Sequence, residues 1–355
     1  MQHRKTEWIQ LPQNGTLNDY LTSSSLRRAA EYLKKGELVA FPTETVYGLG
    51  ADGTSEEAVA KIFQAKGRPA DNPLIIHLAD RKQLHQWVAS IPPVADQLIR
   101  FFWPGPLTIV IKHNGQFAPQ VTAGLPTVAL RVPAHPIARA LIQMSGLPIA
   151  APSANRSGKP SPTKAEHVWQ DLQGNVACVI DGGSTEVGLE STVIDLSGEQ
   201  PLLLRPGGLA KEEIERVIGP IQMDPAMLKA SEQPRSPGMK YRHYAPDGEL
   251  WLYQGDPLRM VETIQRKADE WRERGKKVGI LTTTEHQQQY LADLVIACGT
   301  RKKPETVARN LFQTFHQFNA AQVQLILAES FPEQGLYYSV MNRLKKAATK
   351  RFGDC

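Results

Sequence analysis

Two different patterns of apolar and polar positions divide this chain. In the first, short apolar runs that predict strands alternate irregularly with amphipathic segments that predict helices. The predicted strands are 37–41, 73–78, 107–112, 127–132, 148–151, 177–181, 191–196 and 202–205. The predicted helices are 23–35, 80–90, 94–101, 135–145, 163–171 and 210–218, with a further helix between the capping-box pattern at 54–57 and Gly67. Because the strands come in clusters, we expect a mixed, twisted and partly antiparallel α/β sheet.

The second pattern is a regular alternation of strand and helix. Strands are predicted at 249–253, 277–281, 293–297 and 323–328, and helices at 257–273, 285–291, 303–318 and 335–350. This alternation indicates a smaller, doubly wound parallel α/β domain. Residues 219–248 between the two patterns are rich in proline and read as a linker without a regular element. We therefore predict domains at 1–218 and 249–355, joined by 219–248.

Composition narrows the class of protein. The chain has 355 residues, with 41 Lys and Arg against 36 Asp and Glu, a net charge of +5. This small excess favours anionic ligands such as nucleotides or RNA. No apolar run approaches the about 18 residues that cross a bilayer, the N-terminal residues do not resemble a secretion signal, and the three cysteines lie far apart. We expect a cytoplasmic protein with no membrane association.

The glycines and histidines of the sequence do not indicate a dinucleotide site, a phosphate-binding loop or a metal site. GLGADG at 48–53 matches a dinucleotide fingerprint, but the preceding predicted strand ends seven residues too early for the tight turn which that site needs. The segment instead reads as a loop whose glycines adopt positive φ. The spacing of a phosphate-binding loop at 183–190 lacks its Lys-Ser/Thr pair, and the scattered histidines predict no metal site built from protein side chains.

Cationic and small polar residues gather at element ends. Lys66 and Arg68 flank a predicted helix end, where they either oppose the helix dipole or grip phosphate. The loop 151–158 follows an apolar strand and is either an ordinary turn or a ligand loop. Arg131 and Arg205 each end an apolar strand, and each either reaches water or binds an anionic group.

These segments together resemble the YrdC-like threonylcarbamoyl-AMP synthases, in the longer form with an additional C-terminal domain. The resemblance rests on FPTETVYGLG (41–50), KGRP (66–69), NPLIIH (72–77), FWPGPLT (102–108), PSAN (152–155), ESTVID (190–195), RPG (205–207) and SPGMKYRHYAP (236–246). Members of the family form threonylcarbamoyl-AMP and pyrophosphate from L-threonine, bicarbonate and ATP. The product is passed to a transferase complex that modifies tRNA to threonylcarbamoyladenosine.

The resemblance also implies roles for individual residues. It implies a catalytic core of Lys66, Arg68, Ser153 and Asn155. It implies threonine contacts at Thr45, His77, Arg131, Ala151 and Ser191. It implies ATP contacts at Arg68, Asn72, Thr127, Ser153, Ser161 and Arg205. Magnesium is expected as a cofactor that arrives with ATP, and weak tRNA binding is a further expectation.

The segment 236–246 carries aromatic and cationic side chains that are unusual for a tether. We predict that Tyr241, His243 and Tyr244 form a lid that closes over bound ATP. Two other functions stay open at this stage. One is an enzyme that makes carbamoyl-adenylate for another acceptor, although Thr45, His77 and Arg131 argue against it. The other is an RNA-binding module without catalysis, which the small net charge does not favour.

Overall fold

The structure is a computed structural model that describes residues 5–225 and 244–353. Its internal contacts divide the chain into two compact units. The described part of the first unit runs to residue 225 without the short segments 158–160 and 187–189. The second unit comprises those two segments and the described residues from 244 onward.

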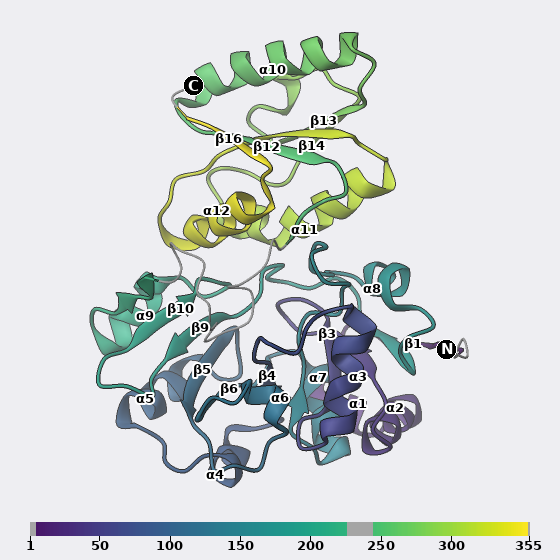
Figure 1. Cartoon of the computed structure of the whole chain (residues 1–355), viewed down its shortest axis with the longest axis vertical. Helices are drawn as coiled ribbons and strands as arrows, with labels where there is room; N and C mark the ends of the chain where they lie inside the picture. The colour runs from purple at the N-terminus through teal and green to yellow at the C-terminus, as the bar shows by residue number, and fades with distance from the viewer. Residues whose placement is uncertain (1–4, 226–243, 354–355) are drawn as a thin grey trace. The chain divides into compact units, whose positions relative to one another are not determined.

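An eleven-stranded mixed sheet forms the centre of the first unit, in the order β1-β8-β2-β3-β7-β4-β6-β5-β9-β10-β11 (Figure 1). Its strands are β1 (Glu7–Gln10), β2 (Val39–Phe41), β3 (Gly48–Asp52), β4 (Ile75–His77), β5 (Leu107–Lys112), β6 (Thr127–Arg131), β7 (Ile149–Ala150), β8 (Cys178–Asp181), β9 (Thr192–Asp195), β10 (Leu202–Arg205) and β11 (Gln222–Met223). Parallel pairs such as β4–β6 lie beside antiparallel pairs such as β5–β6, which confirms the expected mixed sheet.

The helices of this unit are α1 (Leu17–Leu21), α2 (Ser24–Lys34), α3 (Glu56–Lys66), α4 (Leu84–Trp87), α5 (Pro93–Phe102), α6 (Pro119–Thr122), α7 (Pro136–Ser145), α8 (Ala165–Leu172) and α9 (Lys211–Ile218), with the 3-10 turn η1 (Arg81–Gln83) before α4. The local sequence determines where α3 begins and ends. The Ser55 side chain accepts a hydrogen bond from the Ala58 amide, and Gly67 ends the helix at a φ of 61°. Lys66 is therefore fixed as the last helical residue.

The two faces of the sheet are covered differently. On one face, alternate residues such as Ile76, Leu130 and Ile194 belong to the main hydrophobic core. On the other face, α1, α2 and α7 pack together over the β1 end of the sheet (Figure 1). The remaining part of that second face carries a small apolar cluster of Ile75, Val110, Ala129, Val193 and Leu204, all from strands. The predicted site residues of β4 and β6 share this face with the cluster.

The second unit has a five-stranded, fully parallel sheet in the order β14-β13-β15-β12-β16. The strands are β12 (Glu249–Tyr253), β13 (Val278–Thr282), β14 (Leu294–Ala297), β15 (Leu325–Glu329) and β16 (Lys350–Phe352). Figure 1 shows α10 (Pro257–Glu273) on one side of the sheet, and α11 (Pro304–Ala320) and α12 (Gly335–Ala347) on the other. The predicted doubly wound parallel fold is confirmed.

Several predicted elements differ from the structure. Residues 285–291 form only a 3-10 turn, η3 (Gln287–Gln289), instead of a helix. The predicted linker contributes β11, which pairs with β10. The sequence patterns also missed β1, α1, α6 and β16, which are short elements of three to five residues.

The glycine-rich segment 48–53 is the most informative difference. It was expected to be a loop with positive φ, but Gly48–Asp52 is strand β3, paired with β2 and β7. The glycines are required by close packing. A Cβ atom at Gly53 would lie 2.5 Å from the Ile76 side chain and 2.8 Å from the Pro148 carbonyl oxygen, and one at Gly50 would lie 2.8 Å from Phe41.

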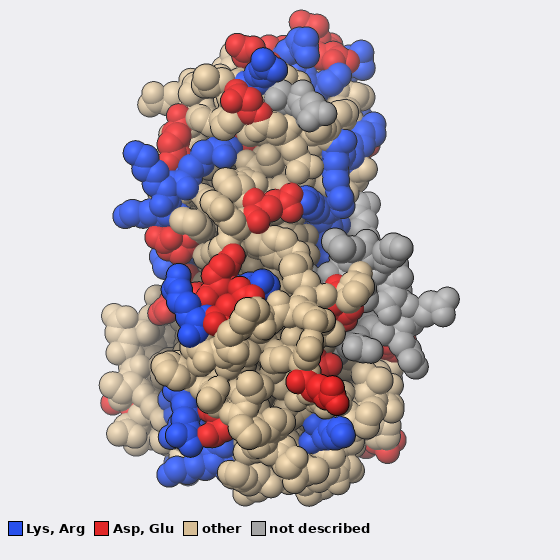
Figure 2. All heavy atoms as spheres, turned by 90° about the vertical axis from the view of Figure 1, so that its left-hand side faces the viewer, with Lys and Arg blue, Asp and Glu red and all other residues tan. Residues whose placement is uncertain are grey.

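Charged side chains of both signs lie interspersed on the face of the molecule in Figure 2. This mixed distribution agrees with a net charge of only +5. It does not have the appearance of a basic surface that binds a nucleic acid through its phosphates alone.

Candidate active site

Lys66 is held inside the first unit by the loop that follows β7. Its ammonium group donates to the carbonyl oxygens of Ser153 (2.5 Å) and Asn155 (2.7 Å), and the residue is 4% exposed. Burial and the nearby charge of Arg68 lower the pKa of Lys66 to about 7. The expectation that Lys66 lies at an exposed helix end is wrong, because a loop 87 residues later in the chain covers it.

Arg68 follows the helix end and is also buried, at 8% exposed. Its guanidinium donates to the Asn72 carbonyl oxygen at 3.1 Å and lies above the ring of Phe63. This arrangement fixes the turn 67–72 and places two cationic side chains within one short segment. A buried pair of like charges is favourable where an anion binds, so the geometry suits phosphate.

The loop carrying Ser153 and Asn155 is fixed by backbone contacts. Ala154 donates to the Tyr47 carbonyl oxygen at 2.9 Å, and Ser153 forms a bridge with Gly48. The structure thus brings Lys66, Ser153 and Asn155 of the predicted catalytic core into direct contact, with Arg68 two residues beyond Lys66. Ala151, Pro152, Ala154 and Asn155 of this loop are buried, whereas Arg156 is exposed.

Arg131 lies at the end of β6 and is 3% exposed. Its guanidinium donates to the Gly105 carbonyl oxygen (3.1 Å) and to the Thr45 hydroxyl (2.9 Å), and forms an ion pair with Glu44 at 2.7 Å. Of the two alternatives for this arginine, contact with water is excluded and contact with an anionic group is realised by Glu44. Sequence reasoning did not single out Glu44, although it lies within the FPTETVYGLG motif.

His77 lies directly opposite Arg131 in the β4–β6 register. Burial and the charge of Arg131 lower the pKa of His77 to about 3, so its imidazole is neutral at pH 7. Ala151 closes the same region, because its amide donates to the Ile75 carbonyl oxygen at 2.9 Å. Thr45, His77, Arg131 and Ala151 are therefore brought together, as the resemblance implied.

A second buried polar group surrounds Ser191. The Ser191 hydroxyl lies 2.7 Å from the Thr108 hydroxyl, and Arg205 donates to both the hydroxyl and the carbonyl oxygen of Ser191. Next to it in the chain, Glu190 accepts a hydrogen bond from Ser161 at 2.5 Å. Glu190 is a further buried residue that sequence reasoning did not select, because only contacts between distant segments mark it.

Thr127 marks the opposite end of β6. It lies four residues before Arg131 on the same face, about 13 Å away along the strand. The fully buried Asn72 precedes β4, the strand that pairs with β6. The predicted ATP contacts Asn72 and Thr127 thus lie toward one end of these strands, and the predicted threonine contacts His77 and Arg131 lie at the other.

Of the predicted lid, Tyr241 and His243 lie outside the described residues. The ring of Tyr244 is buried in the second unit, where it stacks on Phe312 at 5.3 Å and lies under the guanidinium of Arg343. To cover an adenylate, this ring would have to leave both contacts. The role of these residues at ATP stays a prediction.

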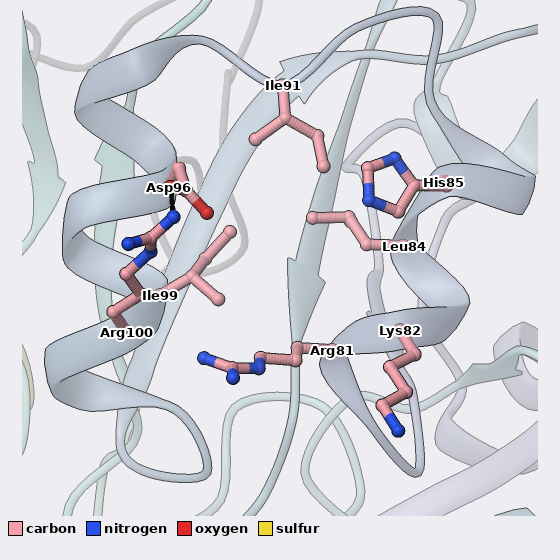
Figure 3. A pocket seen from close by; sticks show the side chains of 8 residues that line it. All are labelled: Arg81, Lys82, Leu84, His85, Ile91, Asp96, Ile99 and Arg100. Carbon is pink, nitrogen blue, oxygen red and sulfur yellow. Dashed lines mark ion pairs between the residues drawn. The ribbon is translucent and has the colours of Figure 1, made fainter.

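A separate cavity of about 370 Å³ lies between η1, α4 and α5 in the first unit. Figure 3 shows its apolar residues Leu84, Ile91 and Ile99, with charged side chains including the Asp96–Arg100 ion pair (2.7 Å). None of the predicted site residues lines it. The predicted site residues thus lie outside this cavity.

Comparison with known proteins decides which family has this arrangement. A family profile described as "Telomere recombination" matches residues 31–207, and one described as "Threonylcarbamoyl-AMP synthase, C-terminal domain" matches residues 209–349. A Bacillus subtilis threonylcarbamoyl-AMP synthase is 52% identical over 92% of this chain and 93% of its own length. The chain belongs to the threonylcarbamoyl-AMP synthase family.

Other family members extend this similarity to the structure. A threonylcarbamoyl-AMP synthase of Pyrococcus abyssi is 50% identical over 92% of this chain and 94% of its own length. The crystal structure of P. abyssi Sua5 complexed with L-threonine superposes with a TM-score of 0.92 at 47% identity, covering 99% of this chain and all of that chain. The similarity of both units to one solved protein confirms the two-part α/β fold.

Within the described ranges, no group of three His, Cys, Asp or Glu side chains has the arrangement of a metal site. The Lys, Arg, Ser, Thr and Asn side chains of the site suit phosphate and carboxylate, and they lie beside the buried carboxylates of Glu44 and Glu190. None of the described helices is long and apolar enough to span a bilayer.

Proposed function

We propose that this protein is a cytoplasmic nucleotidyltransferase that converts L-threonine, bicarbonate and ATP into threonylcarbamoyl-AMP and pyrophosphate. Membership of the family and the threonine bound to the P. abyssi relative support the proposal. The observation that carries it is the buried contact of Lys66 with Ser153 and Asn155, in the same unit as the buried Arg131.

The reaction needs two bond-forming steps. The threonine nitrogen first attacks bicarbonate, so that a nitrogen–carbon bond forms and hydroxide leaves as water with a proton from nitrogen. A carboxylate oxygen of the resulting N-carboxythreonine then attacks the α-phosphorus of ATP, and the bond to pyrophosphate breaks. Negative charge accumulates on phosphate oxygens in the second step, so fixed cations and donors provide the catalysis.

The residue types fit these steps. Lys66 and Arg68 would contact phosphate oxygens, with Ser153 and Asn155 completing the donor set. Phosphate would also raise the pKa of Lys66 and keep it charged, since its low pKa results from burial beside Arg68 without an anion. When bound with ATP, Mg²⁺ would neutralise part of the charge on the phosphates.

At the threonine end, Arg131 would bind the carboxylate, while Thr45, His77, Ala151 and Ser191 surround the amino acid. A neutral His77 can accept or donate a hydrogen bond without adding a second cation beside Arg131. Arg205 supports Ser191 through its carbonyl oxygen and hydroxyl. The ATP contacts proposed for Asn72, Thr127, Ser161 and Arg205 complete the assignment.

The product is a mixed anhydride of a carbamate and a phosphate, which water hydrolyses. A labile product of this kind has to be transferred promptly to its acceptor. We infer that it passes to a transferase complex that modifies tRNA, and that direct contact of this protein with tRNA is weak, as the small net charge of +5 suggests.

The test is pyrophosphate release by the full chain with ATP, Mg²⁺ and each of the twenty amino acids in turn, with and without bicarbonate. We expect release that requires both L-threonine and bicarbonate. Release with carbamoyl phosphate in place of threonine would indicate the carbamoyl-adenylate reaction instead. Absence of release together with tight binding of tRNA would indicate an RNA-binding module.

A further inference from the structure

Glu44 is a buried carboxylate that the assignments above leave without a role. The side chain of Glu44 is 6% exposed, and that of Arg131, its ion-pair partner at 2.7 Å, is 4% exposed. The second carboxylate oxygen, Oε2, has no hydrogen-bond partner among the residues that the structure describes. A buried carboxylate is unfavourable unless its oxygens are paired, so an unpaired oxygen here suggests that a ligand supplies the missing donor.

Charged and titratable groups from other segments of the chain lie near Glu44. Arg131 on β6 forms the ion pair, and His77 on β4 lies opposite Arg131. His135, directly before α7, is close enough to Glu44 for the carboxylate to oppose the lowering of its pKa, which burial brings to about 4. Both histidines are therefore neutral at pH 7, and Arg131 is the cation that faces Glu44.

An α-amino acid carries a carboxylate and an ammonium group on neighbouring atoms. The Arg131–Glu44 pair offers the two opposite charges side by side, and it does so next to the Thr45 hydroxyl. Resting on the function proposed above, we propose that Glu44 binds the α-ammonium group of threonine and accepts one proton from it. Arg131 holds the carboxylate of the same molecule.

The proton transfer makes the nitrogen a nucleophile. The ammonium group gives one proton to the Glu44 carboxylate, which becomes a neutral carboxylic acid, and the free amine attacks bicarbonate. The second nitrogen proton leaves with hydroxide as water, and Glu44 returns its proton to solvent after product release. Substrates that lack an α-amino group would lose the contact with Glu44 altogether.

Binding can be tested without catalysis by calorimetry of L-threonine and (R)-3-hydroxybutyrate, which lacks only the α-amino group. With the unmodified protein, we expect L-threonine to bind about 10- to 100-fold more tightly than (R)-3-hydroxybutyrate. With Glu44→Gln, the two ligands should differ by less than about threefold. Glu7→Gln, which removes the exposed ion pair with Arg28, is the matched control and should retain the full difference.

The base function predicts a change in pH profile that a purely structural role would not produce. For Glu44→Gln, kcat should fall at least about 100-fold at pH 7 and recover as the pH rises toward the pKa of the free amine. Glu44→Asp keeps a carboxylate and should retain part of the activity. Equal discrimination between the two ligands in Glu44→Gln and in the unmodified protein, or an unchanged pH profile, would overturn the proposal.

A crystal structure of the unmodified protein with L-threonine tests the contact between Glu44 and the threonine nitrogen even if the variants do not fold. We expect the threonine nitrogen within about 3.2 Å of a Glu44 oxygen. A nitrogen beyond about 4 Å would refute the contact. Failure of the function proposed above is distinguishable, because it would appear as absent threonine-dependent pyrophosphate release in the unmodified protein.

Discussion

At the scale of single residues, Lys66 combines a positive charge with almost complete burial. The Ser153 and Asn155 carbonyl oxygens compensate part of the cost of burial, yet the pKa of Lys66 still falls to about 7. The sequence predicted a phosphate site at Lys66 and Arg68, which stays a prediction. It placed them at the surface because helix periodicity describes only local neighbours, whereas the covering loop begins more than eighty residues later.

Lys66→Ala should lower the rate of pyrophosphate release by at least about 100-fold, because a fixed cation at the phosphates is lost. It should also lower the free energy of unfolding by about 1–3 kcal/mol, since two buried carbonyl oxygens lose their donor. Lys61→Ala, on the same helix but with a partly exposed side chain, is the matched control and should change the rate by less than twofold. A normal rate for purified, folded Lys66→Ala would contradict the phosphate role.

The lowered pKa of Lys66 makes a prediction for stability without ligands. The pKa is about 7 in the folded protein and 10.5 in the unfolded chain, so between these values the unfolded state binds more protons. The contribution of Lys66 to the free energy of unfolding therefore rises with pH over this window, and is constant below about pH 6. Urea titrations of the unmodified protein and Lys66→Met at pH 6 and pH 9 measure this contribution.

We expect the stability of the unmodified protein relative to Lys66→Met to increase from pH 6 to pH 9. Comparing the two proteins cancels the titration of all other groups that the substitution leaves unperturbed. A relative stability that is constant or falls over this range would show that Lys66 keeps its ordinary pKa when folded.

At the scale of elements, apolar runs located strands well where bulky apolar residues fill them. The bounds predicted for β5, β10, β12 and α10 agree with the structure to the residue. The failures have physical causes. Strand β3 was missed because Gly48 and Gly50 give it a turn-like composition, while the reason for those glycines, contact with Phe41 and Ile149, lies in other strands.

The close packing directly after β3 can be tested by adding one methyl group at Gly53. Gly53→Ala should lower the free energy of unfolding by about 1–3 kcal/mol, because its Cβ would overlap the Ile76 side chain and the Pro148 carbonyl oxygen. Gly198→Ala, where the added methyl group meets open space, is the control and should stay within about 0.5 kcal/mol of the unmodified protein. Equal stability of the two variants in urea would show that β3 tolerates a side chain there.

At the scale of the whole molecule, the functional assignments concentrate in the first unit, and the second unit has a buried polar group of its own. The Glu329 carboxylate is fully buried and accepts hydrogen bonds from Thr282 (2.5 Å), Tyr290 (2.9 Å) and Arg301, with His286 at 3.0 Å. These contacts join the ends of strands to the segments that follow β13 and β14. We therefore expect this group to stabilise the second unit.

Glu329→Ala should lower the free energy of unfolding of the second unit by about 3–5 kcal/mol, because Arg301 loses its buried partner. Glu273→Ala, which removes an exposed carboxylate from α10 of the same unit, should have little effect. Below the melting temperature, Glu329→Ala should bind L-threonine with normal affinity, since the predicted threonine contacts belong to the first unit. Calorimetric melting curves and threonine titrations measure both quantities.

The pairing of β4 with β6 limits how the protein can misfold. If β6 slipped by one residue, Arg131 would turn toward the main core and Leu130 toward the ligand face. The error would bury an unpaired guanidinium among aliphatic side chains, so this misfolded form would be too unstable to accumulate. Correct assembly of the candidate site is thus coupled to folding itself. In a preparation with intact covalent chemistry, the fraction of molecules that bind threonine should equal the fraction that are folded.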